Sequence, residues 1–194
     1  MSELIDCISG YAYSSSELVQ KSTTALTTIK NFGRNGGFKD SGFKAMAPCK
    51  NPKPNQYLEV FDLIVAHTDL TQAADIIGNA EIVLTKGSYE KLVMSSDLVK
   101  VVPKSDLGVF IISSIFKQNN FKEYAIGYSS GTTVLHLNKK CIPDYLVRLP
   151  VNLSDTKQID NELSLYYKQI ALHIEENQIL TQVRNELLST LMVK

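Results

Sequence analysis

Three short clusters of residues carry side chains that can hydrogen-bond to a ligand. They comprise Lys30, Asn31, Arg34, Asn35 and Lys39; Thr68, Thr71 and Gln72; and Ser129, Ser130, Thr132 and Thr133. Arg and Lys neutralise phosphates and pair with guanine, Asn and Gln pair with adenine, and Ser and Thr donate to phosphates. The clusters are therefore typical of a surface that reads DNA. Turn chemistry is the alternative, because Ser, Thr, Asn and Gly favour turns for backbone reasons alone.

The charge distribution bears on the same question. The 20 basic and 20 acidic residues give a net charge of zero, whereas a nucleic-acid-binding domain is expected to be basic. The stretch from Lys21 to Lys53 nevertheless holds seven basic residues and one acidic residue, Asp40. A neutral total can hide one basic face; a solvated loop with ordinary lysines is the alternative. Within the clusters, Asn31 and Gln72 are the predicted base readers, because an amide side chain can make two hydrogen bonds to adenine.

Motifs for catalysis, for a metal or for a cofactor are missing from the sequence. The three histidines lie far apart and have no partner at metal-ligand spacing. Residues 32–37 are glycine-rich but lack the Lys-Ser/Thr of a P-loop. Residues 51–54 depart from the Asn-Pro-Pro-aromatic motif of adenine methyltransferases at Lys53, and no cofactor-binding glycine motif precedes them. We therefore predict no catalytic residue, no metal site and no cofactor.

The elements that hold the clusters are predicted to be short strands and one helix. Apolar alternation and β-branched residues predict strands at residues 25–29, 60–66, 80–84, 98–102, 132–137 and 145–149. Helical spacing predicts a helix over 106–117 with Ser105 as its N-cap. Gly, Pro and Asn punctuate residues 31–55, which are predicted to be a long loop. The fold class is therefore a mixed α+β globular domain.

A long helix is predicted to follow, since residues 156–191 contain neither Pro nor Gly. It would span roughly 50 Å at 1.5 Å per residue. Its apolar residues fall on two separate stripes, so it must be covered on two sides. One small domain cannot do this, and a partner helix is expected; a helix packed back on its own domain is the alternative. The predicted partner-facing residues are Ile159, Leu163, Tyr166, Ile170, Leu172, Ile179, Val183, Leu187 and Leu188.

Length and composition fit a soluble protein of one domain with an appendage, or of two small domains. The chain has 194 residues, of which 44% are hydrophobic and 21% charged. No apolar run of about 18 residues predicts a membrane span, and the N-terminus lacks the basic region of a signal peptide. Three isolated cysteines, Cys7, Cys49 and Cys141, fit a reducing, cytoplasmic setting.

Four segments, taken in order and with their spacing, resemble the specificity subunits of type I restriction-modification systems. Residues 10–15 look like the family's glycine-aromatic opening. Residues 61–72 resemble its strand followed by an A-x-T-D-x-T stretch, and residues 131–138 resemble its next hallmark. The end of the family's conserved helix is matched by Leu180, Arg184, Leu187 and Leu188.

The chain departs from the family between residues 149 and 158. The family has a Pro-rich run and then Glu-Gln before its helix, and here only Pro150 and Gln158 correspond. This departure lies outside the three polar clusters.

The resemblance implies a target recognition domain over residues 1–152 and a helix for dimerisation and assembly over residues 153–194. It implies a non-catalytic subunit that recognises half of a bipartite double-stranded DNA target and positions methyltransferase and nuclease subunits. Family subunits usually carry two recognition domains and two helices, so one of each implies a half-subunit that pairs with a second copy or a second half-subunit. Two-fold pairing would require a palindromic target. The alternative is a protein-interaction module that assembles through its long helix without DNA specificity.

Overall fold

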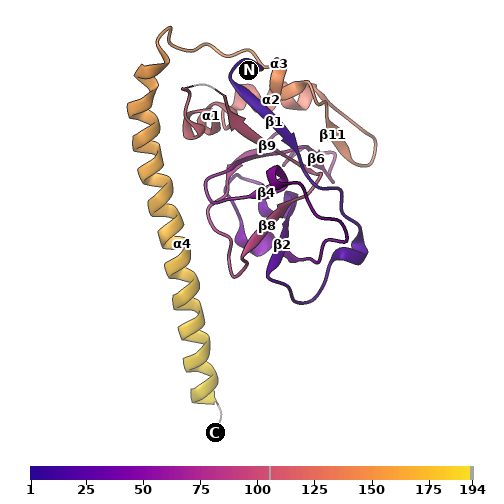
Figure 1. Cartoon of the computed structure of the whole chain (residues 1–194), viewed down its shortest axis with the longest axis vertical. Helices are drawn as coiled ribbons and strands as arrows, with labels where there is room; N and C mark the ends of the chain where they lie inside the picture. The colour runs from indigo at the N-terminus through magenta and orange to yellow at the C-terminus, as the bar shows by residue number, and fades with distance from the viewer. Residues whose placement is uncertain (105, 193–194) are drawn as a thin grey trace.

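The computed structural model describes residues 1–104 and 106–192, and shows a mixed α+β domain with a long helix beside it (Figure 1). The predicted fold class is confirmed. The strands are β1 (Ile5–Ser9), β2 (Thr24–Thr27), β3 (Lys44–Ala45), β4 (Tyr57–Leu58), β5 (Leu63–Ala66), β6 (Thr68–Asp69), β7 (Ala80–Ile82), β8 (Lys91–Met94), β9 (Leu98–Pro103), β10 (Ser129–Ser130) and β11 (Leu135–Leu137). The α-helices are α1 (Val109–Phe116), α2 (Asn119–Gly127), α3 (Cys141–Asp144) and α4 (Lys157–Met192). Single 3-10 turns are η1 (Ser15–Glu17), η2 (Ile29–Asn31), η3 (Asp40–Gly42), η4 (Pro54–Gln56) and η5 (Leu153–Thr156).

The strands form three sheets. The first has the order β1-β9-β5-β7 and is antiparallel throughout. The second has the order β3-β2-β8-β4, in which β2 and β8 are parallel. The third is small and has the order β10-β11-β6. The first sheet is the middle layer of the domain, because one apolar cluster joins it to α1 and α2 and another joins it to the second sheet.

Strand β5 is apolar at every position because both of its faces are covered. Leu63 and Val65 lie in the cluster with α1 and α2, whereas Ile64 and Ala66 lie in the cluster shared with the second sheet. Successive side chains of a strand point to opposite faces, so a central strand needs this continuous apolar run. Burying each of the larger side chains contributes about 1.5–3 kcal/mol.

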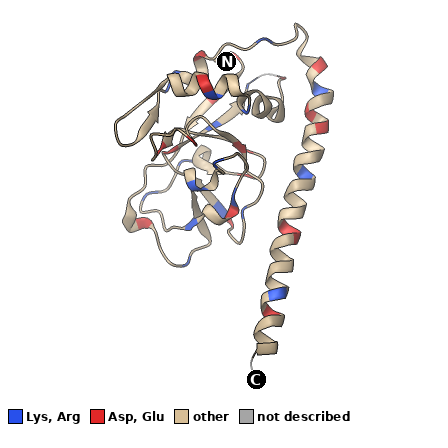
Figure 2. Ribbon diagram, turned by 180° about the vertical axis from the view of Figure 1, so that it is seen from behind, with Lys and Arg blue, Asp and Glu red and all other residues tan. Residues whose placement is uncertain are grey.

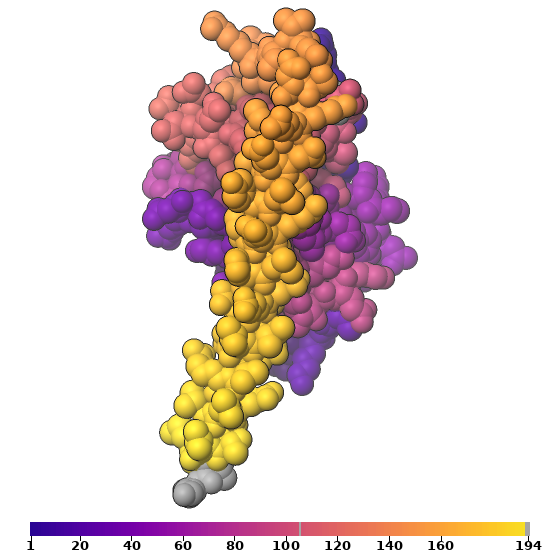
Figure 3. All heavy atoms as spheres, turned by 90° about the vertical axis from the view of Figure 1, so that its left-hand side faces the viewer, coloured from indigo at the N-terminus to yellow at the C-terminus, as the bar shows by residue number. Residues whose placement is uncertain are grey.

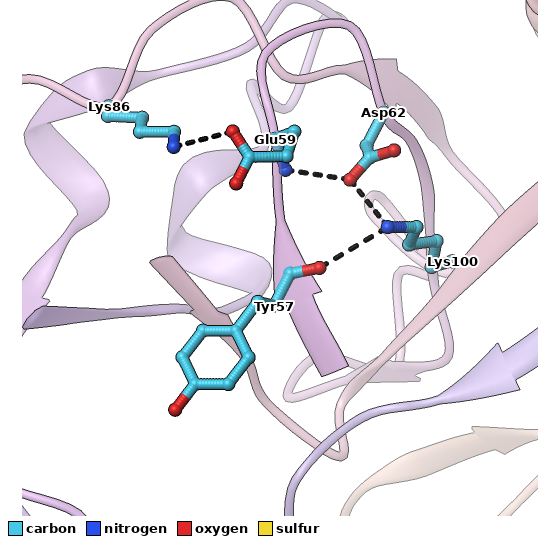
Figure 4. Close-up of polar contacts among 5 residues, drawn as sticks. All are labelled: Tyr57, Glu59, Asp62, Lys86 and Lys100. Carbon is cyan, nitrogen blue, oxygen red and sulfur yellow. Dashed lines mark hydrogen bonds and ion pairs between the residues drawn. The ribbon is translucent and has the colours of Figure 1, made fainter. Parts of the chain in front are cut away.

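A lysine interrupts the apolar pattern of β9. The side chain of Lys100 is only 14% exposed, and its Nζ donates to Asp62 Oδ2 at 2.7 Å and to the Tyr57 carbonyl at 3.2 Å (Figure 4). The same Asp62 oxygen accepts from the Glu59 N–H at 2.7 Å, and Glu59 pairs with Lys86 at 2.6 Å. A buried charge is tolerated only when it is paired. This network therefore holds Lys100 inside the first sheet and ties it to the end of β4 in the second.

The glycine-aromatic opening packs against the second sheet. A Cβ on Gly10 would lie 1.9 Å from the Ser95 carbonyl oxygen, so this approach requires glycine. The Tyr11 hydroxyl donates to Glu17 at 2.5 Å, and the same carboxylate oxygen accepts from the Cys49 N–H at 2.7 Å. The hydrogen bond from Tyr11 is the main cause that lowers the pKa of Glu17 to about 2. The motif therefore fixes the loop around residue 49 by hydrogen bonds to one carboxylate.

Some predicted elements differ from the observed ones. The predicted helix at 106–117 is α1, and its proposed N-cap Ser105 lies outside the described residues. Residues 145–149 are not a strand: Tyr145, Val147 and Leu149 pack against the core, and Tyr145 contacts the Phe121 ring at 5.0 Å. Apolar and polar side chains do alternate along residues 145–149. The segment, however, is an extended strap that packs its apolar side chains against the core and joins no sheet. Helix α2 was not predicted.

Helix α4 packs on the domain over its first part only. Its domain-facing residues recur every three or four positions: Asp160, Leu163, Tyr167, Ala171, Ile174 and Gln178. Tyr167 stacks on Phe110 of α1 with ring centroids 5.1 Å apart, and Gln178 Nε2 donates to Asp40 Oδ2 at 2.6 Å. The C-terminal end of the helix extends past the domain (Figure 3). Beyond Gln178 the same face continues as Thr181, Gln182, Asn185 and Ser189, all exposed, and Gln182 still lines a cavity with Val60 and Lys86 of the domain.

The domain contact corrects one partner-helix assignment. Leu163 is partly buried against the domain core, so it cannot face a partner as predicted. The alternative, in which the helix packs back on its own domain, is therefore correct for one face of α4 between Asp160 and Gln178. The other eight predicted partner-facing residues are exposed.

Asp160 caps α1 from another helix. The N-cap position of α1 is Gly108, and a Cβ there would lie 1.9 Å from the Asp160 Cγ. Asp160 Oδ1 accepts from the N–H groups of Phe110 and Ile111 at 3.0 and 2.9 Å. These are the second and third residues of α1, whose N–H groups an N-cap side chain ordinarily takes.

We expect Asp160→Ala to lower the free energy of unfolding by about 1–2 kcal/mol, because the buried end of α1 loses its cap. Urea unfolding followed by circular dichroism measures the change. Glu175→Ala removes an exposed carboxylate from the same helix and should leave the midpoint unchanged. Equal midpoints for the two variants would show that the cap contributes nothing.

Candidate nucleic-acid interface

The first and second polar clusters meet across a cavity of about 250 Å³. Lys30, Arg34 and Lys39 line one side, and Leu70 and Thr71 line the other. The three cationic side chains are exposed. Segments more than 25 residues apart in sequence therefore present their polar groups to one depression.

The second and third clusters are joined by the small sheet. Strand β6 pairs with β11, and β11 pairs with β10, so these segments lie side by side (Figure 1). Gln72 Nε2 also donates to the Thr132 carbonyl at 2.9 Å. Together with the cavity, these contacts make the three clusters one surface, which we call the reading surface. We define it by the exposed and half-buried residues of the three clusters and by Leu70, which lines the shared cavity.

Residues 32–38 form a tight turn that presents Arg34 and Asn35. Phe32 and Phe38 are bridged as in a hairpin, and the Gly33 N–H donates to the Gly37 carbonyl at 2.8 Å. Gly36 and Gly37 have φ angles of 84° and 93°, which other residues rarely adopt. The glycines therefore form the turn, and Arg34 and Asn35 are exposed on it.

The Glu81 carboxylate holds this turn by a hydrogen bond to its backbone. Its carboxylate, almost fully buried, accepts from the Gly37 N–H at 2.6 Å and from Lys117 Nζ at 2.8 Å. Burial disfavours the Lys117 ammonium, but Glu81 outweighs this and raises the pKa of Lys117. Lys117 Nζ also contacts the Tyr167 hydroxyl of α4 at 3.4 Å. Since Asp40 contacts Gln178 as well, the basic loop is tied to α4 at two points.

Asp69 organises the turn after β6. Its Oδ1 accepts from the Thr71 N–H and hydroxyl at 2.9 Å each, and its Oδ2 accepts from the N–H groups of Ile76 and Ile77 at 2.6 and 3.1 Å. Burial opposes ionisation, but these hydrogen bonds outweigh it and lower the pKa of Asp69. The T-D-x-T stretch therefore builds a fixed turn. Asp followed two residues later by Thr is typical of an Asx turn, a signal that could have identified Asp69.

Asn31 is not a base reader. Its side chain is fully buried, its Oδ1 accepts from the Thr28 N–H at 3.0 Å, and its Nδ2 donates to the Lys39 carbonyl at 2.8 Å. Both ends of the amide are therefore used inside the fold, where they fix the backbone of Lys39. Thr68 is also buried, because it lies within β6. The structure contradicts the prediction that these two side chains contact DNA.

The other predicted residues remain accessible to different degrees. The exposed ones are Lys30, Arg34, Asn35, Lys39, Gln72, Ser130, Thr132 and Thr133. Thr71 and Ser129 are half-buried, and their hydroxyls donate to Asp69 and to the Ile126 carbonyl. Those two hydroxyls can still accept a hydrogen bond, but their own hydrogens are already used.

The other charged and thiol groups of the described residues form no metal-binding cluster. Lys and Arg are spread over the domain, and both signs alternate along α4 (Figure 2). Within residues 1–104 and 106–192, no group of three His, Cys, Asp or Glu side chains is placed to hold a metal ion. No described helix is both long and apolar enough to cross a membrane. Burial is the main cause that raises the pKa of the Cys141 thiol to about 12, so it is not a reactive thiolate at neutral pH.

No family model and no curated protein matches this sequence. The structure is similar to the S subunit of a type I restriction-modification system from M. genitalium, with a TM-score of 0.63 and 13% identity over 95% of this chain and 42% of that one. It is similar to a chain from the structure describing complex assembly and conformational transition of the type I R-M system, with a TM-score of 0.53 and 16% identity over 96% and 41%. A third similar structure is the HsdS subunit from Thermoanaerobacter tengcongensis, with a TM-score of 0.51 and 12% identity over 91% and 38%.

The chain spans about two fifths of the length of these three structures. The similarity includes the long helix as well as the domain, since it covers at least 91% of this chain. The chain therefore has the fold of part of the type I restriction-modification specificity subunits, with one mixed α+β domain and one long helix.

Proposed function

We propose that this chain recognises DNA sequence for a type I restriction-modification complex. It binds one half of a bipartite double-stranded target and catalyses no reaction itself. The observation that carries the proposal is the convergence of three polar clusters on one reading surface in a chain with this fold. Methyl transfer and DNA cleavage belong to partner subunits, which this chain positions.

The reading surface divides by chemistry into two kinds of contact. Lys30, Arg34 and Lys39 are long, exposed cations, and we assign them to phosphates, where they set affinity. Asn35 and Gln72 carry exposed amides and are the candidates for base contacts. Each good bidentate base contact contributes about 1–3 kcal/mol of discrimination. Ser130, Thr132 and Thr133 supply hydroxyl groups for phosphates or bases.

We assign residues 1–152 to recognition and residues 153–194 to assembly. The exposed apolar residues of α4 then contact a second copy or a second half-subunit, and the resulting helical pair is the platform for the methyltransferase subunits. A two-fold arrangement places two reading surfaces on two half-sites, so a homodimer should read a palindromic bipartite sequence.

Selection of bound fragments from a random DNA pool, with the methyltransferase subunit present, tests the proposal. We expect one bipartite motif to be enriched, and we expect its binding to weaken steeply with salt because phosphate contacts release counterions. The alternative, a protein-interaction module, rests on the exposed apolar residues of α4. It predicts assembly that salt leaves intact and no enriched motif, and this result would overturn the proposed function.

A further inference from the structure

A large apolar side chain stands within the reading surface. Leu70 is 64% exposed and lines the same cavity as Lys30, Arg34 and Lys39. Single exposed leucines are ordinary on protein surfaces, so exposure alone assigns no role. Its cavity is lined by the three cations that we assign to phosphates and also by Asp69 and Asp75. A side chain beside those cations would face the groove between the phosphates.

The backbone around Leu70 is held on both sides. Asp69, the preceding residue, is 1% exposed and ends β6, which pairs with β11. Its carboxylate binds the N–H groups of Thr71, Ile76 and Ile77, so the turn that begins at Leu70 closes around a buried anion. Little backbone freedom is lost when such a turn binds a ligand, which favours its use in recognition.

Only one base offers an apolar group in the major groove of unmodified DNA. Thymine presents its C5-methyl there, whereas all other major-groove features are hydrogen-bond donors or acceptors. The lysines, arginine, amides and hydroxyls of the reading surface cannot recognise a methyl group by hydrogen bonding. Leu70 can recognise the methyl group by van der Waals contact, because the contact removes the apolar surfaces of both groups from water.

We propose that Leu70 contacts the C5-methyl of a thymine and makes the chain prefer thymine at one position of its half-site. This inference rests on the proposed function. It adds a specificity-determining residue whose contact with the base is apolar.

Deoxyuridine substitution tests this directly, because uracil differs from thymine only by the absent methyl. Each thymine of the selected target is replaced in turn, and binding is measured by fluorescence anisotropy at one salt concentration. We expect one thymine per half-site at which uracil weakens binding roughly fourfold, the loss of one buried methyl-sized group. In Leu70→Ala the same substitution should cause no further loss, because the two changes remove one contact.

Leu146→Ala is the matched control. Leu146 is 89% exposed and lies in the strap before α4, outside the reading surface. This variant should keep the full response to uracil at the sensitive position. Circular dichroism of Leu70→Ala confirms its fold, and the wild-type scan is informative without any variant.

The inference and the proposed function fail in different ways. If no motif is enriched from the random pool, the proposed function fails. If a motif is enriched but lacks thymine, or if uracil is tolerated at every thymine by the wild type, the role of Leu70 is overturned. The role is also overturned if Leu70→Ala responds to uracil as strongly as the wild type does.

Discussion

Replacing Lys30, Arg34 and Lys39 together with alanine should weaken DNA binding on the order of 100-fold near physiological salt, because three phosphate contacts are lost. All sequences should be weakened alike. The slope of the logarithm of the binding constant against the logarithm of the salt concentration should fall in magnitude by about three, or about one per contact. Anisotropy titrations of the selected target and of scrambled DNA at four salt concentrations measure both effects.

A charge-matched variant separates the reading surface from the general basic character of the segment. Lys21, Lys50 and Lys53 belong to the same basic stretch and are exposed, but they do not line the cavity that the first two clusters share. Their triple alanine variant loses the same three charges. It should keep most of the affinity and the full salt slope. Equal losses in the two triple variants would place the DNA elsewhere on the domain.

The parts of the fold that the sequence predicts well are those where one pattern dominates. β5 is predictable because burial on both faces requires four apolar residues in a row, and β9 is recognisable despite Lys100. The long helix is predictable because no Pro or Gly interrupts it. Residues 145–149 show the limit: their apolar alternation is the same whether the segment pairs in a sheet or lies as an unpaired strap on helices.

The errors in the candidate site have a common cause. Asn31 has the same amide whether it reads a base or closes a 3-10 turn, and local sequence does not distinguish the two uses. Glu81 and Gln178 were missed because their partners, Gly37 and Asp40, are 44 and 138 residues away in the chain. Side chains that act through distant contacts leave no spacing to detect. The exposed side chains of short loops, by contrast, could be identified from residue type.

The apolar periodicity predicted for α4 is present, but the structure divides the faces of the helix differently. The sequence predicts apolar residues on two sides of α4, both of them facing a partner. The structure gives a third face, from Asp160 to Gln178, to the chain's own domain. Beyond Gln178 that face becomes largely polar. Five exposed apolar residues gather on the opposite side, as Ile179, Leu180, Val183, Leu187 and Leu191, whereas Leu188 and Met192 lie outside this group. From Leu180 onward the residues of this group are three, four and four positions apart, close to the spacing of three and four in a coiled-coil seam.

We therefore expect the part of α4 beyond Gln178 to form the main contact between two copies. Its seam residues are between 46% and 73% exposed in the single chain, and Ile179, at the start of the seam, also lines a cavity with Val60 and Lys86 of the domain. Changing Val183 and Leu187 to Asp should convert the dimer to monomers. Each buried apolar-to-Asp change costs about 2 kcal/mol or more, and a two-fold dimer carries each change twice.

Sedimentation equilibrium at tens of micromolar measures this, with Gln182→Asp plus Asn185→Asp as the control. Those residues lie on the same turns but on the polar face, so the control adds equal charge and should stay dimeric.

The monomeric variant keeps its reading surface and should still bind a single half-site. Its affinity for the full target should be much lower, because two linked sites bind more tightly than one. A wild-type chain that sediments as a monomer, or a control that dissociates equally, would contradict the seam. A monomer that binds neither site would show that the helix also shapes the reading surface, through the contacts of Tyr167 with Lys117 and of Gln178 with Asp40.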